Sequence, residues 1–211
     1  MLWVETRYKS HTVWFFMFLR KYHTLSDEKL MARIQRGDTA AFDELYTRYS
    51  KRMLYYFHRM LGGDEEKAQD FLQDLFLKIV EKPARFKRGH AFTSWLYTVA
   101  HNMCKNEYRK QSVRKIVVND PDIDMHCGWV DGDHAIEKAC DERAFLRALM
   151  DELDKLSVDQ RTTFLLRHQE CHSIREISQI LQCPEGTVKS RLHHVTQKLA
   201  ERLQGRNSLC G

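Results

Sequence analysis

Hydrophobic positions recur at steps of three and four residues along most of the chain, which is the period of an α-helix. A first short run follows Ser26, a residue suited to the N-cap position, and a longer run ends at Gly62. A third run begins after Asp64, a second candidate N-cap, and Pro83 closes it. Its apolar stripe consists of Ala68, Phe71, Leu72, Leu75, Phe76 and Ile79. The first third of the chain is therefore predicted to be helical.

A fourth helix is expected to start at Thr93 or Ser94, after the loop 83–91. Its inward positions are predicted to be Phe92, Trp95, Val99 and Met103. Residues 114–134 then show no sustained periodicity and contain Asp-Pro, Cys-Gly and Asp-Gly steps, which are typical of a linker.

The part of the chain after the linker is predicted to form four short helices. Two capping boxes, Ser157 with Gln160 and Ser173 with Glu176, open the second and third of them. The last two are joined tightly through residues 182–184, the outline of a helix-turn-helix. The final helix carries one apolar seam, made of Val188, Leu192, Val195, Leu199 and Leu203.

No strand pattern is found, and only 3 prolines and 9 glycines interrupt 211 residues. The predicted fold class is all-α: two small helical domains joined by a flexible linker, the C-terminal one a helix-turn-helix. The expected boundaries are an N-terminal extension, a first domain, the linker and a second domain, at 1–24, 25–113, 114–134 and 135–206.

Charge is unevenly distributed along the chain. The net charge of +5 is compatible with a polyanionic partner but is too common to identify one. Residues 81–115 hold nine basic and two acidic side chains, whereas residues 119–141 hold seven acidic and one basic. A basic block followed by an acidic stretch indicates a domain edge and its linker.

Two segments have the chemistry of nucleic-acid binding. The fourth helix leaves four residues on its polar side, Asn102, Lys105, Arg109 and Lys110, with aromatic residues close by. Cations of this kind hold phosphates and aromatic faces stack bases, although a buried Trp95 beside a solvated basic edge would give the same pattern. The start of the last helix exposes Thr187, Lys189, Ser190, Arg191 and His194, where a helix-turn-helix meets base edges.

A polar cluster lies opposite the apolar stripe of the third helix. Asp70, Gln73 and Asp74 are spaced at i, i+3 and i+4 and so share one face. Their spacing alone favours an ordinary solvated face.

The sequence gives little support for a metal site, a disulfide framework or a membrane-spanning segment. Six scattered cysteines without a CxxC pair indicate reduced thiols in a cytosolic protein, and neither Cys171-His172 nor His126-Cys127 forms a convergent ligand set. No cofactor is expected. Near the N-terminus the apolar run 13–19 is too short to span a membrane, and the basic residues after it do not suit a signal peptide. An extra helical turn, an extension, or a true start at Met17 would explain it.

Four motifs in order resemble the extracytoplasmic-function group of bacterial RNA polymerase sigma factors, within the sigma-70 family. They are "LMARIQRGDTAAFDELYTRY", "AQDFLQDLFLKIV", "FTSWLYTVAHNMCKNEYRK" and "EISQILQCPEGTVKSRLHHVTQKL", and they cover residues 25–204. The motif "GTVKSRL" alone would be only moderately specific, because other helix-turn-helix regulators end similarly; together the four are specific.

The resemblance implies a role for each segment. Asp70, Gln73 and Asp74 fall where the family docks on the largest subunit of core RNA polymerase, which reverses the solvated-face interpretation. Asn102, Lys105, Arg109 and Lys110 fall in the helix that faces the promoter −10 element, and Arg85, Lys87 and Arg88 lie in the loop that captures an extruded base. The −35 element would be read as duplex by Glu185, Gly186, Thr187, Lys189, Ser190, Arg191 and His194.

The same family resemblance implies further partners. The C-terminal domain would bind the second-largest polymerase subunit, the acidic linker would pass through the RNA exit region, and an anti-sigma factor is a typical partner. His194 stands where the family commonly has Arg, and Val195 where it has Ala, so the phosphate contact at His194 is expected to be weaker and sensitive to pH. Residues 1–24 match no part of the family pattern.

Two other function classes fit parts of the sequence. A transcription regulator with a C-terminal helix-turn-helix would not need the docking triplet or the basic helix before the linker. A metal-dependent nuclease would need a carboxylate cluster at metal-ligand spacing or a glycine-rich phosphate loop, and the sequence has neither. The expectation is therefore a promoter-specificity subunit that acts by binding and strand separation and is not an enzyme.

Overall fold

The computed structural model describes residues 22–87, 89–118 and 138–207. Within these residues all regular structure is helical, which confirms the all-α fold class. The N-terminal helical group consists of α2 (Asp27–Ile34), α3 (Thr39–Met60), α4 (Glu65–Glu81), the 3-10 turn η1 (Pro83–Arg85) and α5 (Phe92–Val118). The C-terminal helical group consists of α6 (Lys138–Asp154), α7 (Val158–His168), α8 (Ile174–Leu181) and α9 (Glu185–Asn207).

Side-chain caps define where the helices of the N-terminal group begin. The Ser26 hydroxyl accepts a hydrogen bond from the Lys29 backbone N, and the Asp64 carboxylate accepts one from the Lys67 backbone N at 2.9 Å. Both caps were predicted from the sequence. The apolar stripe of α4 is buried against α3 as its spacing requires, with only Phe71 partly exposed among its predicted members.

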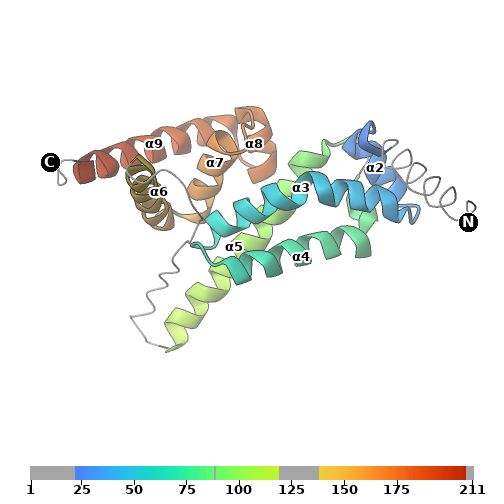
Figure 1. Cartoon of the computed structure of the whole chain (residues 1–211), viewed down its shortest axis with the longest axis horizontal. Helices are drawn as coiled ribbons and strands as arrows, with labels where there is room; N and C mark the ends of the chain where they lie inside the picture. Colours follow the sequence, from blue (N-terminus) through green and yellow to red (C-terminus); the bar gives the residue numbers. More distant parts are fainter. Residues whose placement is uncertain (1–21, 88, 119–137, 208–211) are drawn as a thin grey trace, which may run out of the picture.

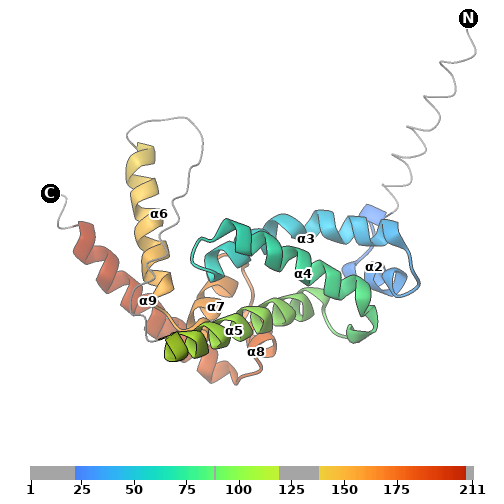
Figure 2. The same cartoon turned by 90° about the horizontal axis from the view of Figure 1, so that it is seen from below.

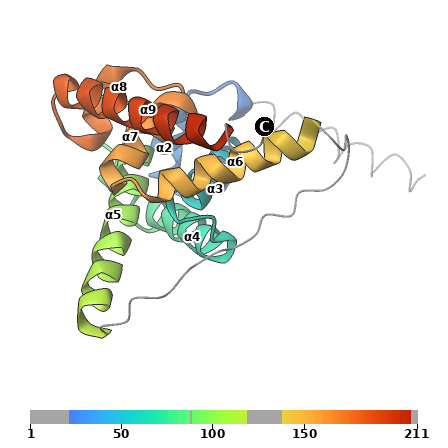
Figure 3. The same cartoon turned by 90° about the vertical axis from the view of Figure 1, so that its left-hand side faces the viewer.

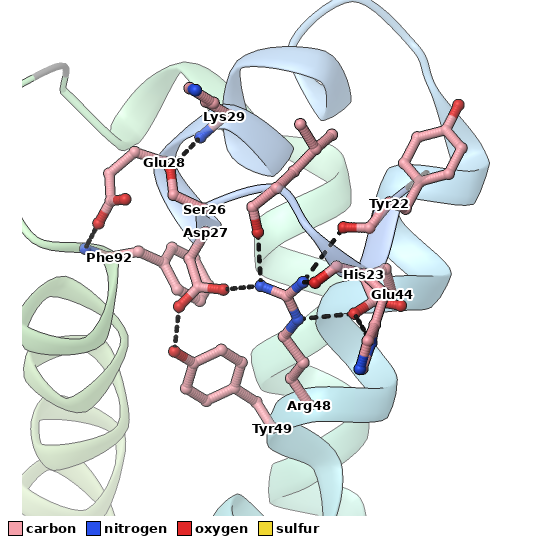
Figure 4. A network of polar contacts seen from close by, with 11 residues as sticks. Tyr22, His23, Ser26, Asp27, Glu28, Lys29, Glu44, Arg48, Tyr49 and Phe92 are labelled. Atoms are coloured by element: carbon pink, nitrogen blue, oxygen red, sulfur yellow. Dashed lines mark hydrogen bonds and ion pairs between the residues drawn. The ribbon is translucent and has the colours of Figure 1, made fainter. Parts of the chain in front are cut away.

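Arg48 ties the segment before α2 to α3 (Figure 4). Its guanidinium donates to the Asp27 carboxylate at 2.6 Å and to the Glu44 carboxylate at 2.7 Å. It also donates to the backbone carbonyls of Tyr22, His23 and Leu25. This arrangement uses the planar fork of an arginine, which explains how α2 is held although it has only eight residues.

The C-terminal group contains the helix-turn-helix that was predicted. Both capping boxes form, one at the start of α7 and one at the start of α8. Gln182 ends α8 in the left-handed conformation, with φ +52°, and the Ser178 hydroxyl donates to the Cys183 carbonyl at 2.6 Å. The chain then turns into α9, whose buried seam includes Val188, Val195 and Leu199. Helix α9 packs along α6, as Figure 3 shows.

The two helical groups lie against each other (Figure 1). Helix α5 crosses α7 and α8 and contacts both, which is clearest from below in Figure 2. Glu170 of the C-terminal group is buried and accepts hydrogen bonds from Arg52 at 2.9 Å and from the Tyr97 hydroxyl. Arg161 is 1% exposed and donates to the Met60 carbonyl at 3.0 Å and the Tyr108 hydroxyl at 2.7 Å. Hydrogen bonds of Glu170 and Arg161 thus hold the two helical groups together.

This packing corrects the predicted orientation of α5. The helix begins at Phe92, before the expected Thr93 or Ser94, and its fully buried side chains are Phe92, Leu96, Tyr97, Ala100 and Cys104. The predicted inward residues Trp95, Val99 and Met103 are only partly buried. The physical reason is that α5 is covered on two sides, by α2–α4 and by α7–α8, so a single apolar stripe does not describe it.

Three sequence-based expectations fall wholly or mostly outside the described residues. Residues 1–21 of the proposed extension and residues 119–134 of the proposed linker are not described, and α5 continues to Val118. Arg88 is also outside. In the part of the chain that is described, no helix combines the length and the apolar character needed to cross a bilayer.

Candidate nucleic-acid and polymerase interface

Helix α4 turns the predicted polar triplet outward. Asp70, Gln73 and Asp74 are all exposed, and the Asp74 side chain, 63% exposed, lies 3.8 Å from the Lys78 ammonium in a long ion pair. Two apolar residues continue this exposed side of the helix, Leu77 at 52% and Val80 at 50% exposure. A helix face that combines carboxylates with exposed aliphatic side chains is suited to docking on another protein. The sequence reasoning missed Leu77 and Val80, although their three- and seven-residue spacing from the triplet was readable.

Helix α5 presents its predicted basic edge to solvent. Asn102, Lys105, Arg109 and Lys110 are exposed, as are Arg85 and Lys87 before the helix. Trp95 is partly buried, and its ring meets that of Phe86 at 5.5 Å between centroids. Trp95 is therefore neither a free stacking surface nor a fully buried core residue.

A cleft of about 470 Å³ lies where the loop before α5 faces α8. The N-terminal group contributes Arg85, Lys87 and Trp95 to its lining, and α8 with its cap contributes Gln179 and Gln182. The C-terminal group therefore forms one wall of the cleft that contains Arg85 and Lys87, the residues predicted to hold an extruded promoter base.

Helix α9 exposes most of the predicted −35 residues. Glu185, Gly186, Lys189, Ser190 and His194 are exposed, and Thr187 is half-buried. Arg191 differs from them because its side chain is only 25% exposed and its guanidinium pairs with the Asp159 carboxylate at 2.8 Å. This residue lies at the edge of the helix seam and points toward α7.

Asp159 lies close to basic side chains of both helical groups. Besides Arg191, its carboxylate lies 3.5 Å from His101 Nε2 and 3.9 Å from Lys105 Nζ of α5. Burial lowers the pKa of His101 to about 4, and the charges of Lys105 and Arg191 add to this effect while Asp159 opposes it. His101 is thus neutral at pH 7, and its Nδ1 lies 3.0 Å from the Thr162 hydroxyl.

The structure therefore brings two predicted site residues together, Lys105 for the −10 side and Arg191 for the −35 side. The predicted docking triplet of α4, Asp70, Gln73 and Asp74, takes no part in this cluster. Asp159 was missed by sequence reasoning, because an acid in the first turn of α7 has an ordinary explanation in the positive helix end.

The described residues offer no metal centre. Among them no group of three or more His, Cys, Asp or Glu side chains could hold an ion. Cys104 is buried, Cys171 exposed and Cys183 intermediate, and all three are free thiols. His126 and Cys127, an adjacent pair considered in the sequence, lie outside the described residues.

Comparison with known families gives two matches along the chain. "Sigma-70 region 2" matches residues 45–114, and "Sigma-70, region 4" matches residues 146–199. The first match covers most of the N-terminal helical group, and the second covers most of the C-terminal group.

Curated relatives are similar over nearly their whole length. The RNA polymerase sigma-H factor of Pseudomonas aeruginosa is 34% identical over 187 residues, which cover 84% of this chain and 94% of that protein. The ECF RNA polymerase sigma-E factor of Haemophilus influenzae is 29% identical over 187 residues, covering 85% of this chain and 96% of the relative.

Solved structures share the fold at lower identity. The sigma factor RpoE of Bartonella quintana, in complex with the anti-sigma factor NepR, superimposes with a TM-score of 0.65 at 22% identity over 77% of this chain and 96% of that one. CnrH in complex with the cytosolic domain of CnrY gives a TM-score of 0.62 at 22% identity, over 85% and 97% of the two chains.

Proposed function

The chain belongs to the extracytoplasmic-function group of the sigma-70 family of RNA polymerase sigma factors, and from this premise we propose which of its surfaces perform each step. A sigma factor of this family binds core RNA polymerase, directs it to promoters and initiates transcription, without catalysing a reaction itself. The alignment to a sigma factor covers 84% of this chain. It therefore favours a sigma factor over the two alternatives considered, a nuclease and a regulator that acts apart from polymerase.

We propose that the exposed face of α4 is the docking surface for the largest subunit of core polymerase. Asp70, Gln73 and Asp74 would supply the polar contacts, and Leu77 and Val80 the apolar ones. The observation that carries this proposal is the exposure of two aliphatic side chains, Leu77 and Val80, beside exposed carboxylates on one helix face, because burial of that apolar surface by a partner is favourable.

Promoter DNA would be bound by two separate helices. Helix α5 would meet the −10 element through Asn102, Lys105, Arg109 and Lys110, and the loop before it would hold an extruded base through Arg85, Lys87 and Arg88. Helix α9 would enter the major groove at the −35 element with Glu185, Gly186, Thr187, Lys189, Ser190, Arg191 and His194. The exposure of most of these side chains supports the proposal.

Other partners follow from the family. The C-terminal group would bind the second-largest polymerase subunit. An anti-sigma factor is a further expected partner, because the similar Bartonella quintana sigma factor was crystallised with one. The place of action would be the cytoplasm, where bacterial RNA polymerase works.

Reversal of charge at Asp74 tests the docking surface. Asp74→Arg should weaken binding to core polymerase about tenfold or more, which is about 1.4 kcal/mol, because a cation would replace an exposed carboxylate in the contact. Direct titration of labelled chain with core measures this. Asp43→Arg is the matched control, since it makes the same change of charge at an exposed position of α3, outside both surfaces proposed to bind polymerase. Equal affinity of wild type and Asp74→Arg would refute the assignment.

A further inference from the structure

The loop between α4 and α5 is held at both ends by one short helix, α2. Gln35, the C-cap residue of α2, uses both N–H groups of its side-chain amide: it donates to the Pro83 carbonyl at 3.0 Å and to the Phe86 carbonyl at 3.1 Å. At the other end of the loop, the Glu28 carboxylate of α2 accepts a hydrogen bond from the Phe92 backbone N at 3.1 Å (Figure 4). A helix of eight residues therefore contacts both ends of the loop.

Between these two ends the loop is open to solvent. Phe86 and Phe92 are 3% and 0% exposed, and their rings meet at 5.9 Å between centroids. Lys87 and residues 89–91, which lie between them, are exposed and line the cleft described above. The loop is thus fixed where its two aromatic side chains are buried, and free to meet a ligand in between.

Glu28 also acts as a cap for α5. The residue before Phe92 is Ala91, whose methyl side chain cannot accept a hydrogen bond from the first turn. Glu28 accepts from one of the backbone N–H groups that the first turn of a helix leaves without an intrahelical partner. Its negative charge also suits the positive end of the helix dipole. The point at which the loop enters α5 therefore depends on a residue of α2.

Helix α2 is in turn fixed to α3 by the network of Figure 4. The Arg48 guanidinium donates to the Asp27 carboxylate at 2.6 Å and to the Leu25 carbonyl at 2.9 Å. Asp27 also accepts a hydrogen bond from the Tyr49 hydroxyl, and the Tyr49 ring meets that of Phe92 at 5.3 Å between centroids. The start of α2 and the end of the loop thus rest on the same part of α3.

An anchored loop can bind an extruded base at a lower cost than a loop that must be ordered at the same moment. Extrusion of a base from the duplex is unfavourable, and contacts in the pocket have to offset it. Ordering of the loop would add a loss of conformational entropy to that cost. The hydrogen bonds from α2 remove part of this loss before DNA binds.

We propose that α2 positions the loop that holds the extruded promoter base, and that Gln35 and Glu28 are positioning residues, which act through the loop and do not touch DNA. The inference rests on the proposed function of that loop. Its effect is confined to the extruded base, because neither residue belongs to the surfaces proposed for core polymerase, for the −35 element or for the rest of the −10 element.

The test measures base capture separately from other DNA contacts. Polymerase carrying the full-length chain is titrated with single-stranded oligonucleotides that contain the −10 sequence of a promoter selected with the reconstituted complex. One oligonucleotide is intact, and each of the others is abasic at one position. For wild type, the position with the largest loss of affinity identifies the captured base. The ratio of the abasic to the intact dissociation constant at that position measures its capture.

Two changes in α2 should lower this ratio. Gln35→Glu keeps the side-chain shape but removes the donor, and should lower the ratio about fivefold. Glu28→Ala should lower it about threefold, whereas Glu28→Gln should stay near wild type, because its amide oxygen can still accept from the Phe92 N. Gln197→Ala is the matched control: it removes an exposed glutamine of α9, whose amide donates to Glu201 at 3.0 Å, and should leave the ratio unchanged.

Affinity for the abasic oligonucleotide and for core polymerase should equal wild type in every variant, which separates positioning from a general loss of structure. Circular dichroism checks that each variant remains helical. The comparison of Glu28→Ala with Glu28→Gln tests the proposal even where Gln35→Glu lowers stability.

Three results would overturn the proposal. They are unchanged ratios in both Gln35→Glu and Glu28→Ala, an equal loss of affinity for intact and abasic oligonucleotides, and a Glu28→Gln variant that behaves like Glu28→Ala. The second result would mean that α2 supports the fold as a whole and not the loop. A wild-type chain that loses no affinity at any abasic position would instead refute the proposed function of the loop.

Discussion

The two helices assigned to promoter DNA, α5 and α9, are buried in different ways. Helix α9 has one buried seam, at Val188, Val195 and Leu199, and its remaining sides are open or half-open. Helix α5 is enclosed by helices of its own group and by α7 and α8 of the other. Helix α9 therefore packs within its own helical group, whereas α5 also joins the two groups.

The largest expected effect comes from the core of α5. Leu96 is fully buried, and Leu96→Ala should lower the free energy of unfolding by about 2–5 kcal/mol because it leaves a cavity. Hydrogen exchange should then increase in both helical groups, since α5 packs against both. The matched variant Leu199→Ala, in α9, should increase exchange in the C-terminal group only. Loss of protection confined to the N-terminal group in Leu96→Ala would contradict the two-sided role of α5.

Acid should act on α5 more strongly than on α9. Because the pKa of His101 is about 4 in the folded chain and 6.5 ordinarily, the unfolded chain binds the proton first as pH falls. Stability should therefore drop between pH 6.5 and 4, by roughly 3 kcal/mol at most from this group. The charged groups facing it are Asp159, Lys105 and Arg191.

Denaturant unfolding as a function of pH, with His101→Gln, measures this contribution. The variant should depend less steeply on pH than wild type over that range. Asn102→Gln, which changes an exposed side chain of α5 that does not titrate, should follow the wild-type curve. Parallel curves for His101→Gln and wild type would show that His101 does not contribute.

A smaller effect is expected at the reading face of α9. Arg191→Ala should weaken −35 recognition by the polymerase complex by about 1–3 kcal/mol if its guanidinium reads a base edge. Arg191→Lys separates charge from geometry, since lysine keeps the charge but loses the planar fork. Titration with promoter variants measures both. A loss of the same size on every sequence would assign Arg191 to phosphate rather than to a base.

Much of the fold could be predicted from the sequence, for physical reasons that differ between segments. The caps at Ser26 and Asp64, both capping boxes and the α9 seam depend on local chemistry and a single period, so the sequence specified them correctly. The orientation of α5 was partly wrong, because burial by a distant part of the chain adds positions that no single stripe predicts. The capping role of Gln182 at positive φ was equally unforeseeable.

The candidate site divides in the same way. Exposure of the α4 triplet and of most basic residues of α5 and α9 follows from helix periodicity. The Asp159 cluster and the buried Glu170 do not, because both join residues more than fifty positions apart in the sequence: Asp159 lies near Lys105, and Glu170 binds Arg52 and Tyr97. Long-range polar contacts of this kind leave no periodic signal in the sequence, so the way the two helical groups pack could not be predicted from it.

Run-off transcription shows whether this chain directs core polymerase to promoters. Core polymerase alone and core with this chain would be compared on a promoter selected from a random DNA pool with the reconstituted complex. We expect a product of defined length only when the chain is present. The product should decrease when Asp74→Arg replaces wild type, and also when either the −10 or the −35 sequence is scrambled. A chain that gives no product above core alone, or one whose product ignores both sequences, would contradict this expectation.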